Sequence, residues 1–161
     1  ARNPSGNRAG AVETGRADAS DADESSGYRL EKQIGFILRR ASQRHATIFQ
    51  EEMIAGLTPT QFAALVQLDD AGPCSQNHLG RLTAMDIATI KGVVERLRSR
   101  GLVTIEADRQ DRRRRSLALS DAGRDLVQQA RSHAIMITAQ TLAPLSADEA
   151  RQLLALLSRI A

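Results

Sequence analysis

Aromatic residues are scarce in this chain of 161 residues, which contains no Trp, one Tyr and three Phe. A core without large rings has to be built from Leu, Ile, Val, Ala and Met, as helical proteins often do, and an all-β sandwich is disfavoured. Apolar residues still make up 42% of the chain, which is enough for one packed domain, with or without extensions. We therefore expect a mainly α fold.

Cysteine and metal-binding motifs are equally sparse. The single cysteine, Cys74, excludes an internal disulfide and a cysteine-based metal cage. The three histidines, His45, His78 and His133, lack the spacing of a metal motif, and no Gly-rich phosphate loop or nucleophile elbow is present. We expect no enzyme activity, no metal and no cofactor. A redox role for Cys74 would need an exposed, electropositive setting, which its place beside Pro73 does not indicate.

Long apolar runs are also missing. No stretch approaches the length of a membrane span and no signal-peptide core is seen, which points to the cytoplasm and against a membrane partner. Residues 1–27 have almost no large apolar side chain, so we expect a flexible N-terminal tail. Residues 75–115 hold ten Lys or Arg against five acids, whereas residues 1–27 hold three Arg against five acids. This asymmetry favours a nucleic-acid partner.

The most basic segment runs from Asp108 to Arg115 and has five arginines among its eight residues. A solvated loop tip is the simplest interpretation of such a run. The segment lies, however, between two stretches that alternate like half-buried strands, so the arginines are expected at the tip of a two-stranded ribbon, where they would meet phosphate. The apolar residues of these stretches are Leu102, Val103 and Ile105 before the tip, and Leu117 and Leu119 after it.

Two short helices are predicted before the ribbon, from Ser75 to Leu82 and from Met85 to Arg100, with Gly101 ending the second. Helix, turn, helix and basic ribbon together predict a winged helix-turn-helix. The second helix buries Ile90, Val93, Val94 and Leu97 at helical spacing and turns its other face to DNA. The residues expected to contact DNA are Ser75, Gln76, Asn77, Ala88, Thr89, Lys91, Gly92, Arg96, Arg109, Arg112, Arg113, Arg114 and Arg115. Gly92 would allow close approach to DNA, or would alternatively serve helix packing.

Long helices are predicted on both sides of this centre. The first runs from Tyr28 to about Ala55; a second begins after Thr58, which with Gln61 forms a capping box; the last two begin after Ser120 and Ser146. The expected organisation is a tail (residues 1–27), an N-terminal dimerisation helix (28–56), a winged helix-turn-helix region (57–120) and C-terminal dimerisation helices (121–161). These apolar helices either form a homodimer, which we favour, or pack on their own wing domain.

The chain is similar to the MarR (multiple antibiotic resistance regulator) family of bacterial transcription factors over about residues 30–160. The resemblance rests on Leu57-Thr-Pro-Thr-Gln-Phe62, Asp86-Ile-Ala-Thr-Ile-Lys-Gly-Val-Val-Glu-Arg-Leu97, Arg100-Gly-Leu-Val103, Asp111-Arg-Arg113 and Leu117-Ala-Leu-Ser-Asp-Ala-Gly123. It implies a dimeric repressor that releases DNA when a small molecule binds. It also implies that Asp111 braces the wing tip with Arg112 or Arg113. In the middle of the recognition helix, where members often carry Arg or Lys, this chain has the pair Lys91-Gly92, which is a departure from the family pattern.

The resemblance also points to an effector site on the first helix. Members with a similar Arg-Arg-x-x-x-Arg-His segment tend to control aromatic-acid catabolism, which implies that His45 hydrogen-bonds an aromatic carboxylate and that an arginine faces its carboxyl group. The expected effector residues are Arg40, Arg44, His45 and Phe49. The competing interpretation is a histidine satisfied at a helix or dimer interface.

Two other functions share the basic ribbon. A ligand-independent architectural DNA-binding protein would need no effector pocket and little sequence preference. An RNA-binding module would bring aromatic side chains for stacking, but Tyr28, Phe36, Phe49 and Phe62 are all remote from the ribbon in the sequence. The pattern therefore favours a regulator that binds a pseudo-palindromic double-stranded operator.

Replacing Arg112, Arg113 or Arg114 by Ala should weaken binding to every duplex to a similar degree, because phosphate contacts contain no base information. Binding should also fall steeply with salt, since these side chains release counterions from DNA. Titration of an operator and a random duplex at several salt concentrations measures both effects. A binding constant that is the same at low and physiological salt would contradict the prediction.

Overall fold

A computed structural model describes residues 28–107 and 115–161 of the chain. The chain divides into two units, residues 1–37 and residues 38–161, and each is considered by itself. In the first unit the described part holds a 3₁₀ turn, Leu30–Lys32, and the first residues of helix α1, Ile34–Glu52. The expected tail, residues 1–27, lies outside the described residues. No helix in the two described ranges is long and apolar enough to cross a membrane.

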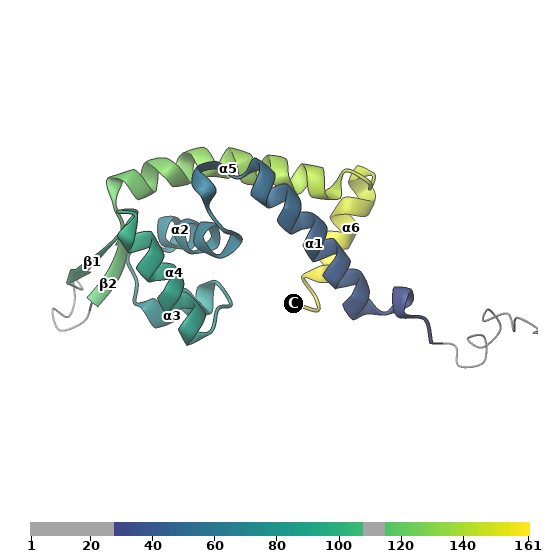
Figure 1. The fold of residues 1–161 in the computed structure, drawn as a ribbon, viewed down its shortest axis with the longest axis horizontal. Coiled ribbons are helices and arrows are strands. Elements are labelled where there is room, and N and C mark those ends of the chain that lie inside the picture. Colours follow the sequence, from purple (N-terminus) through teal and green to yellow (C-terminus); the bar gives the residue numbers. More distant parts are fainter. Residues whose placement is uncertain (1–27, 108–114) are drawn as a thin grey trace, which may run out of the picture. The chain divides into compact units, whose positions relative to one another are not determined.

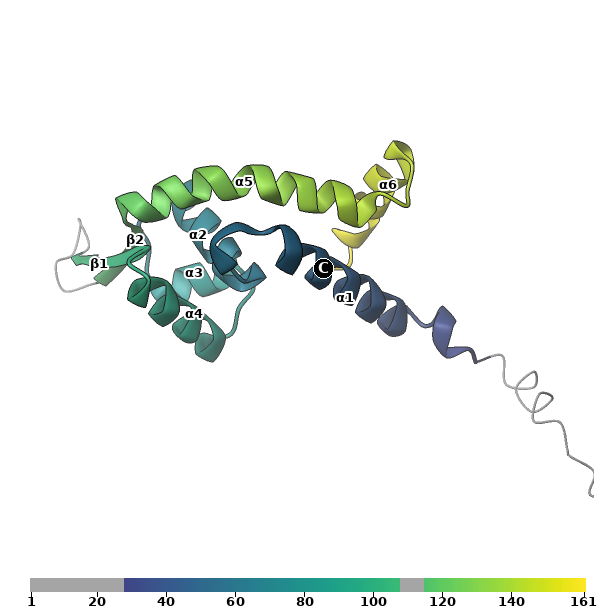
Figure 2. The same cartoon turned by 45° about the horizontal axis from the view of Figure 1, so that its top comes forward.

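The second unit is mainly helical with one small antiparallel sheet, as the sequence predicts (Figure 1). After α1 and a 3₁₀ turn, Ile54–Gly56, the elements are α2 (Pro59–Ala71), α3 (Gln76–Leu82), α4 (Ile87–Ser99), β1 (Val103–Ala107), β2 (Arg115–Leu119), α5 (Asp121–Leu142) and α6 (Ala147–Leu157). In both views α3 and α4 lie together beside the ribbon, and α5 runs along the other side of α2 (Figure 2). This is a helix-turn-helix with a β wing.

Four predicted N-caps are confirmed: Thr58 for α2, Ser75 for α3, Ser120 for α5 and Ser146 for α6. Each side-chain oxygen accepts a hydrogen bond from a backbone N–H in the first turn, which otherwise has no partner in the helix. Thr58 and Gln61 form the predicted capping box, with bonds of 3.3 and 3.2 Å. These caps place the helix starts and hence the direction of each helix.

The predicted bounds of two helices are wrong. The first helix begins at Ile34 rather than Tyr28 and ends at Glu52, because Gln33 before it and Met53 after it have extended backbone conformations. The recognition helix begins at Ile87 rather than Met85. The turn before it is longer than Thr83-Ala84, because Ala84 has φ of 52° and the Met85 N–H donates to the Gly80 carbonyl instead of entering a helix.

The wing departs from simple alternation in its second strand. In β1, Val103 is buried and Thr104 is exposed, but β2 is buried at each position from Ser116 to Leu119. The reason is that β2 has neighbours on both edges: β1 pairs with it antiparallel, and Cys74 exchanges two backbone hydrogen bonds with Leu117, at 3.1 and 2.8 Å. Helices α2 and α5 also contact β2. The base of the wing therefore belongs to the core.

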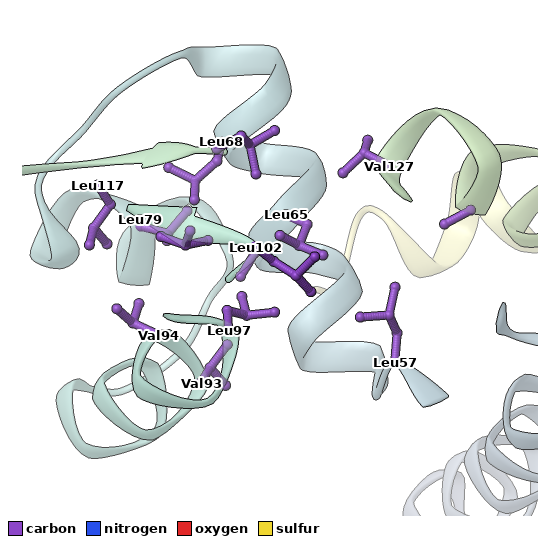
Figure 3. Close-up of a cluster of buried hydrophobic side chains, with 14 of the residues drawn as sticks. Leu57, Leu65, Leu68, Leu79, Val93, Val94, Leu97, Leu102, Leu117 and Val127 are labelled. Atoms are coloured by element: carbon purple, nitrogen blue, oxygen red, sulfur yellow. The ribbon is translucent and has the colours of Figure 1, made fainter. Parts of the chain in front are cut away.

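The core consists mainly of aliphatic side chains from α2, α3, α4, the wing and α5, with Phe49 of α1 (Figure 3). Burying each of these side chains contributes about 1.5–3 kcal/mol relative to leaving it exposed. The largest fully buried side chains are Leu65, Leu79, Ile90, Leu97, Val127 and Ile137. Helix α4 is thereby held on its inner face, with its outer face left exposed.

Two glycines have opposite surroundings. A Cβ on Gly123, in the first turn of α5, would lie 2.1 Å from the carbonyl oxygen of Leu102. A Cβ on Gly92, in α4, would meet only the Arg96 guanidinium, at 3.9 Å. The helix-packing interpretation of Gly92 is therefore wrong for this chain, and Gly123 is the glycine that permits close packing.

Gly123→Ala should lower the free energy of unfolding by about 1–3 kcal/mol, because the backbone of Leu102 has to move away. Gly92→Ala is the matched control and should stabilise the protein by up to about 1 kcal/mol, since Ala favours a helix interior. Urea unfolding measures both. Equal stability of the two variants would contradict the close packing of Gly123 in α5 against the Leu102 carbonyl.

Candidate nucleic-acid interface and effector site

The residues expected to contact DNA gather on the outer side of the helix-turn-helix. In α3 they occupy the N-cap and first turn, at Ser75, Gln76 and Asn77. In α4, Ala88, Thr89, Lys91 and Arg96 are exposed and Gly92 is half-buried, while Arg115 is exposed at the start of β2. Arg109, Asp111, Arg112, Arg113 and Arg114 lie outside the described residues. We expect the surface formed by α3 and the outer side of α4 to contact the major groove.

Thr89 has a structural task that the sequence reasoning missed. The Asp86 carboxylate accepts one hydrogen bond from the Thr89 backbone N–H, at 2.7 Å, and another from its hydroxyl, at 2.8 Å. These bonds hold the pKa of Asp86 below its ordinary value, the backbone bond being the larger cause. Because its hydroxyl proton is engaged, Thr89 serves first as part of the cap that begins the recognition helix. Lys91, one turn into the helix, is the clearer candidate for base contact.

Arg100 is a second residue whose structural role the sequence did not predict. It is the C-cap of α4, and its guanidinium donates to the carbonyl of Ala55 at 2.7 Å and to Oε1 of Gln61 at 3.4 Å. Gln61 is buried, and the same oxygen accepts the Thr58 N–H in the capping box. The end of the recognition helix is therefore tied to the junction between α1 and α2. Only the fold brings together residues 45 positions apart.

Two of the expected effector residues on α1 contact α5. His45 Nδ1 is 3.0 Å from the Thr141 hydroxyl oxygen, and the Arg44 guanidinium donates to the Gln140 carbonyl at 3.1 Å. The His45 ring is 6.0 Å from the buried ring of Phe49, measured between centroids. Arg40 is exposed, one turn earlier. The structure thus brings His45, Arg44 and Phe49 to the boundary between the two helices, with His45 half-buried and already bonded across it.

A groove of about 300 Å³ lies between α2 and α5. Phe62 contributes to its lining and packs edge-on against Phe49, with centroids 6.2 Å apart, so an aromatic row connects His45 to the groove. At the rim, Arg131 donates to Asp69 at 3.0 Å and to Asp70 at 2.6 Å, which raises its pKa. The remaining lining residues are Val66, Ala134, Ile135 and Thr138.

Cys74 and the histidines form no metal centre in the part of the chain that the structure describes. No three side chains of the His, Cys, Asp and Glu types converge there as metal ligands do. Burial raises the pKa of the half-buried Cys74 thiol, which opposes formation of the reactive thiolate. Cys74 instead extends the sheet beside Leu117.

The helix-turn-helix, the antiparallel wing and the exposed cationic recognition helix define a winged-helix DNA-binding protein. The MarR family model matches residues 55–114. The repressor NicR of Pseudomonas putida is 40% identical over 134 residues, which cover 83% of this chain and 85% of NicR. The chain therefore belongs to the MarR family of transcription regulators.

Solved structures agree with this assignment. A probable transcriptional regulator from Pseudomonas aeruginosa is 56% identical, with a TM-score of 0.80 over 83% of this chain and 100% of that one. BpsR of Bordetella bronchiseptica, whose DNA binding is regulated by 6-hydroxynicotinic acid, is 39% identical, with a TM-score of 0.78 over 83% of this chain and 96% of BpsR.

If Lys91 contacts a base, Lys91→Ala should weaken operator binding by about 1–3 kcal/mol and random-duplex binding little. The thermal midpoint of Lys91→Ala should stay unchanged, since the side chain is exposed.

Thr89→Val, in contrast, should lower the thermal midpoint of unfolding, because the hydrogen bond from its hydroxyl to Asp86 is removed. This stability difference should shrink as the pH falls from 3.8 through the lowered pKa of folded Asp86, where the carboxylate becomes protonated. An unchanged midpoint in Thr89→Val at neutral pH would contradict the capping role.

Proposed function

We propose that the chain is a repressor that binds a pseudo-palindromic operator as a homodimer and leaves it when a small aromatic acid binds at the boundary of α1 and α5. The observation that supports this most directly is the 3.0 Å contact between His45 and Thr141. It places a titratable, half-buried ring beside Phe49, where two long helices meet. A ligand bound there acts on both helices, and release requires such differential affinity for two states of the protein.

The chemistry of this boundary suits an aromatic carboxylate. A guanidinium has five N–H donors, so Arg44 can bond a carboxylate while it donates to the Gln140 carbonyl. His45 uses Nδ1 toward Thr141, which leaves Nε2 to face a ring hydroxyl or ring nitrogen. Phe49 and Phe62 supply the edges and faces that an aromatic ring packs against. Arg40 is a second cation within one turn of Arg44.

The relatives narrow the choice of ligand. NicR is named a repressor, and the DNA binding of BpsR is regulated by 6-hydroxynicotinic acid, a ring that holds both a carboxylate and a second polar group. Those two groups correspond to the arginine and histidine on α1. Hydroxylated pyridine carboxylates are therefore the first compounds to test, followed by benzoates.

Exposed apolar side chains support the homodimer. Helix α6 has no buried residue in the single chain. A surface of this kind usually meets another protein surface, and a two-fold dimer lets one surface cover its own copy. Each of the following side chains is at least 37% exposed: Ile34, Ile37 and Leu38 in α1, Leu153, Leu154 and Leu156 in α6, and Ile160 just after it.

His45→Ala should keep operator affinity near that of the wild type and remove ligand-induced release, because the wing does not depend on this side chain. Footprinting with increasing 6-hydroxynicotinic acid, then with a panel of benzoates, measures release. Arg44→Ala or Arg40→Ala should share the phenotype, through loss of the charge-assisted bond. An unaltered response in His45→Ala rules out the assigned role.

Thr141→Val is the control for a purely structural histidine. It removes the same contact between the helices and keeps the imidazole. If His45 binds the ligand, Thr141→Val should still release DNA; if His45 only ties α1 to α5, both variants should fail alike. A wild-type protein that no compound releases would favour the ligand-independent DNA-binding alternative.

A further inference from the structure

Ile87 is the most exposed large apolar residue in the described part of the chain. It is the first residue of α4 and its side chain is 74% exposed. The four other large apolar residues of α4 are at most 3% exposed: Ile90, Val93, Val94 and Leu97. Ile87 therefore makes no comparable contribution to the core. Exposure of an Ile side chain in water is unfavourable by about 1.5–3 kcal/mol relative to burial, which makes this position a candidate for contact with a partner.

The surroundings of Ile87 are those of a base-reading position. The Asp86 cap directly before it is fixed by both bonds from Thr89, so the start of the helix is held in one conformation. Ile87 also borders a hollow of about 280 Å³ between α3 and α4, together with Asn77 and Arg81. Lys91 lies one turn further along the same face. The N-terminal residues of a recognition helix are those that contact base edges.

We propose that Ile87 determines specificity by packing against the C5-methyl group of a thymine in the major groove. The thymine methyl is the apolar group that the base edges present in that groove, and aliphatic side chains are its natural partners. A protein partner fits less well, because the exposed neighbours Asn77, Arg81 and Asp86 are polar or charged, whereas the apolar neighbours Met85 and Ile90 are half-buried and buried. The inference rests on the proposed operator binding and adds to it which base is read and by which side chain.

The test replaces thymine by deoxyuridine, which removes only the methyl group. Operators are first selected by the full-length wild-type protein from a pool of random duplexes. Each thymine of one half-site is then replaced singly, and binding of wild type, Ile87→Ala and Ile87→Val is measured without effector. One replacement should weaken wild-type binding about fourfold, the value of about 0.8 kcal/mol for one buried carbon group. Replacements elsewhere in the half-site are the internal controls.

The double-mutant cycle gives the decisive result. Ile87→Ala should bind the thymine operator more weakly than the wild type and should not distinguish thymine from uracil at that position, whereas Ile87→Val should retain part of the preference. Circular dichroism checks that the variants are folded. Equal wild-type affinity for thymine and uracil at every position overturns the inference about Ile87 but leaves the proposed function standing. A selected operator without thymine in the half-site has the same consequence. Failure to select any operator overturns it together with the proposed function.

Discussion

The backbone of Leu102 is the joint on which the position of the recognition helix depends. Its N–H donates to the Leu97 carbonyl at the end of α4, and its carbonyl accepts the N–H of Ser120 at the start of α5. The Ser120 hydroxyl in turn donates to the Gly101 carbonyl at 2.6 Å and accepts the Gly123 N–H. The backbones of the recognition helix, the wing and α5 are therefore in contact around Leu102. A Cβ on Gly123 would not fit there, so this position requires glycine.

A second joint lies at the same end of the recognition helix, two residues before Leu102. Arg100 donates to Ala55, whose left-handed backbone follows α1, and to Gln61 in the first turn of α2. Between the two joints, α1 and α5 are bonded directly, through His133 to the Glu52 carbonyl and through Gln140 to the Glu52 carboxylate. On the proposed function, a ligand at His45 acts on α1 and α5, which connect to the C-terminal end of the recognition helix through Arg100 and Leu102. Coupling through contacts of this kind needs two discrete arrangements of the joints.

Much of the fold could be predicted from local chemistry. The caps at Thr58, Ser75, Ser120 and Ser146 depend on a side chain and its own next few residues, so the sequence contains all that they need. The start of α4 at Ile87 also has a local signal, because Asp is a preferred N-cap residue and Asp86 precedes it. The tertiary structure adds a hydrogen bond from the Met85 N–H to the Gly80 carbonyl in the preceding helix, which keeps Met85 out of α4. The burial of Ser116 and Ala118 was unpredictable from alternation, since it depends on a strand edge that Cys74 covers.

The candidate site divides in the same way. Residue type and helical period were enough to assign Lys91 and Gly92 to the outer face of the recognition helix and His45 to a stripe on α1, because both assignments need only the geometry of one helix. The bonds of Arg100 to Ala55, of His45 to Thr141 and of Arg131 to the two aspartates join residues 45 to 96 positions apart. Their partners were decided by the tertiary structure alone, because long-range proximity follows from how the helices pack and no local pattern records it.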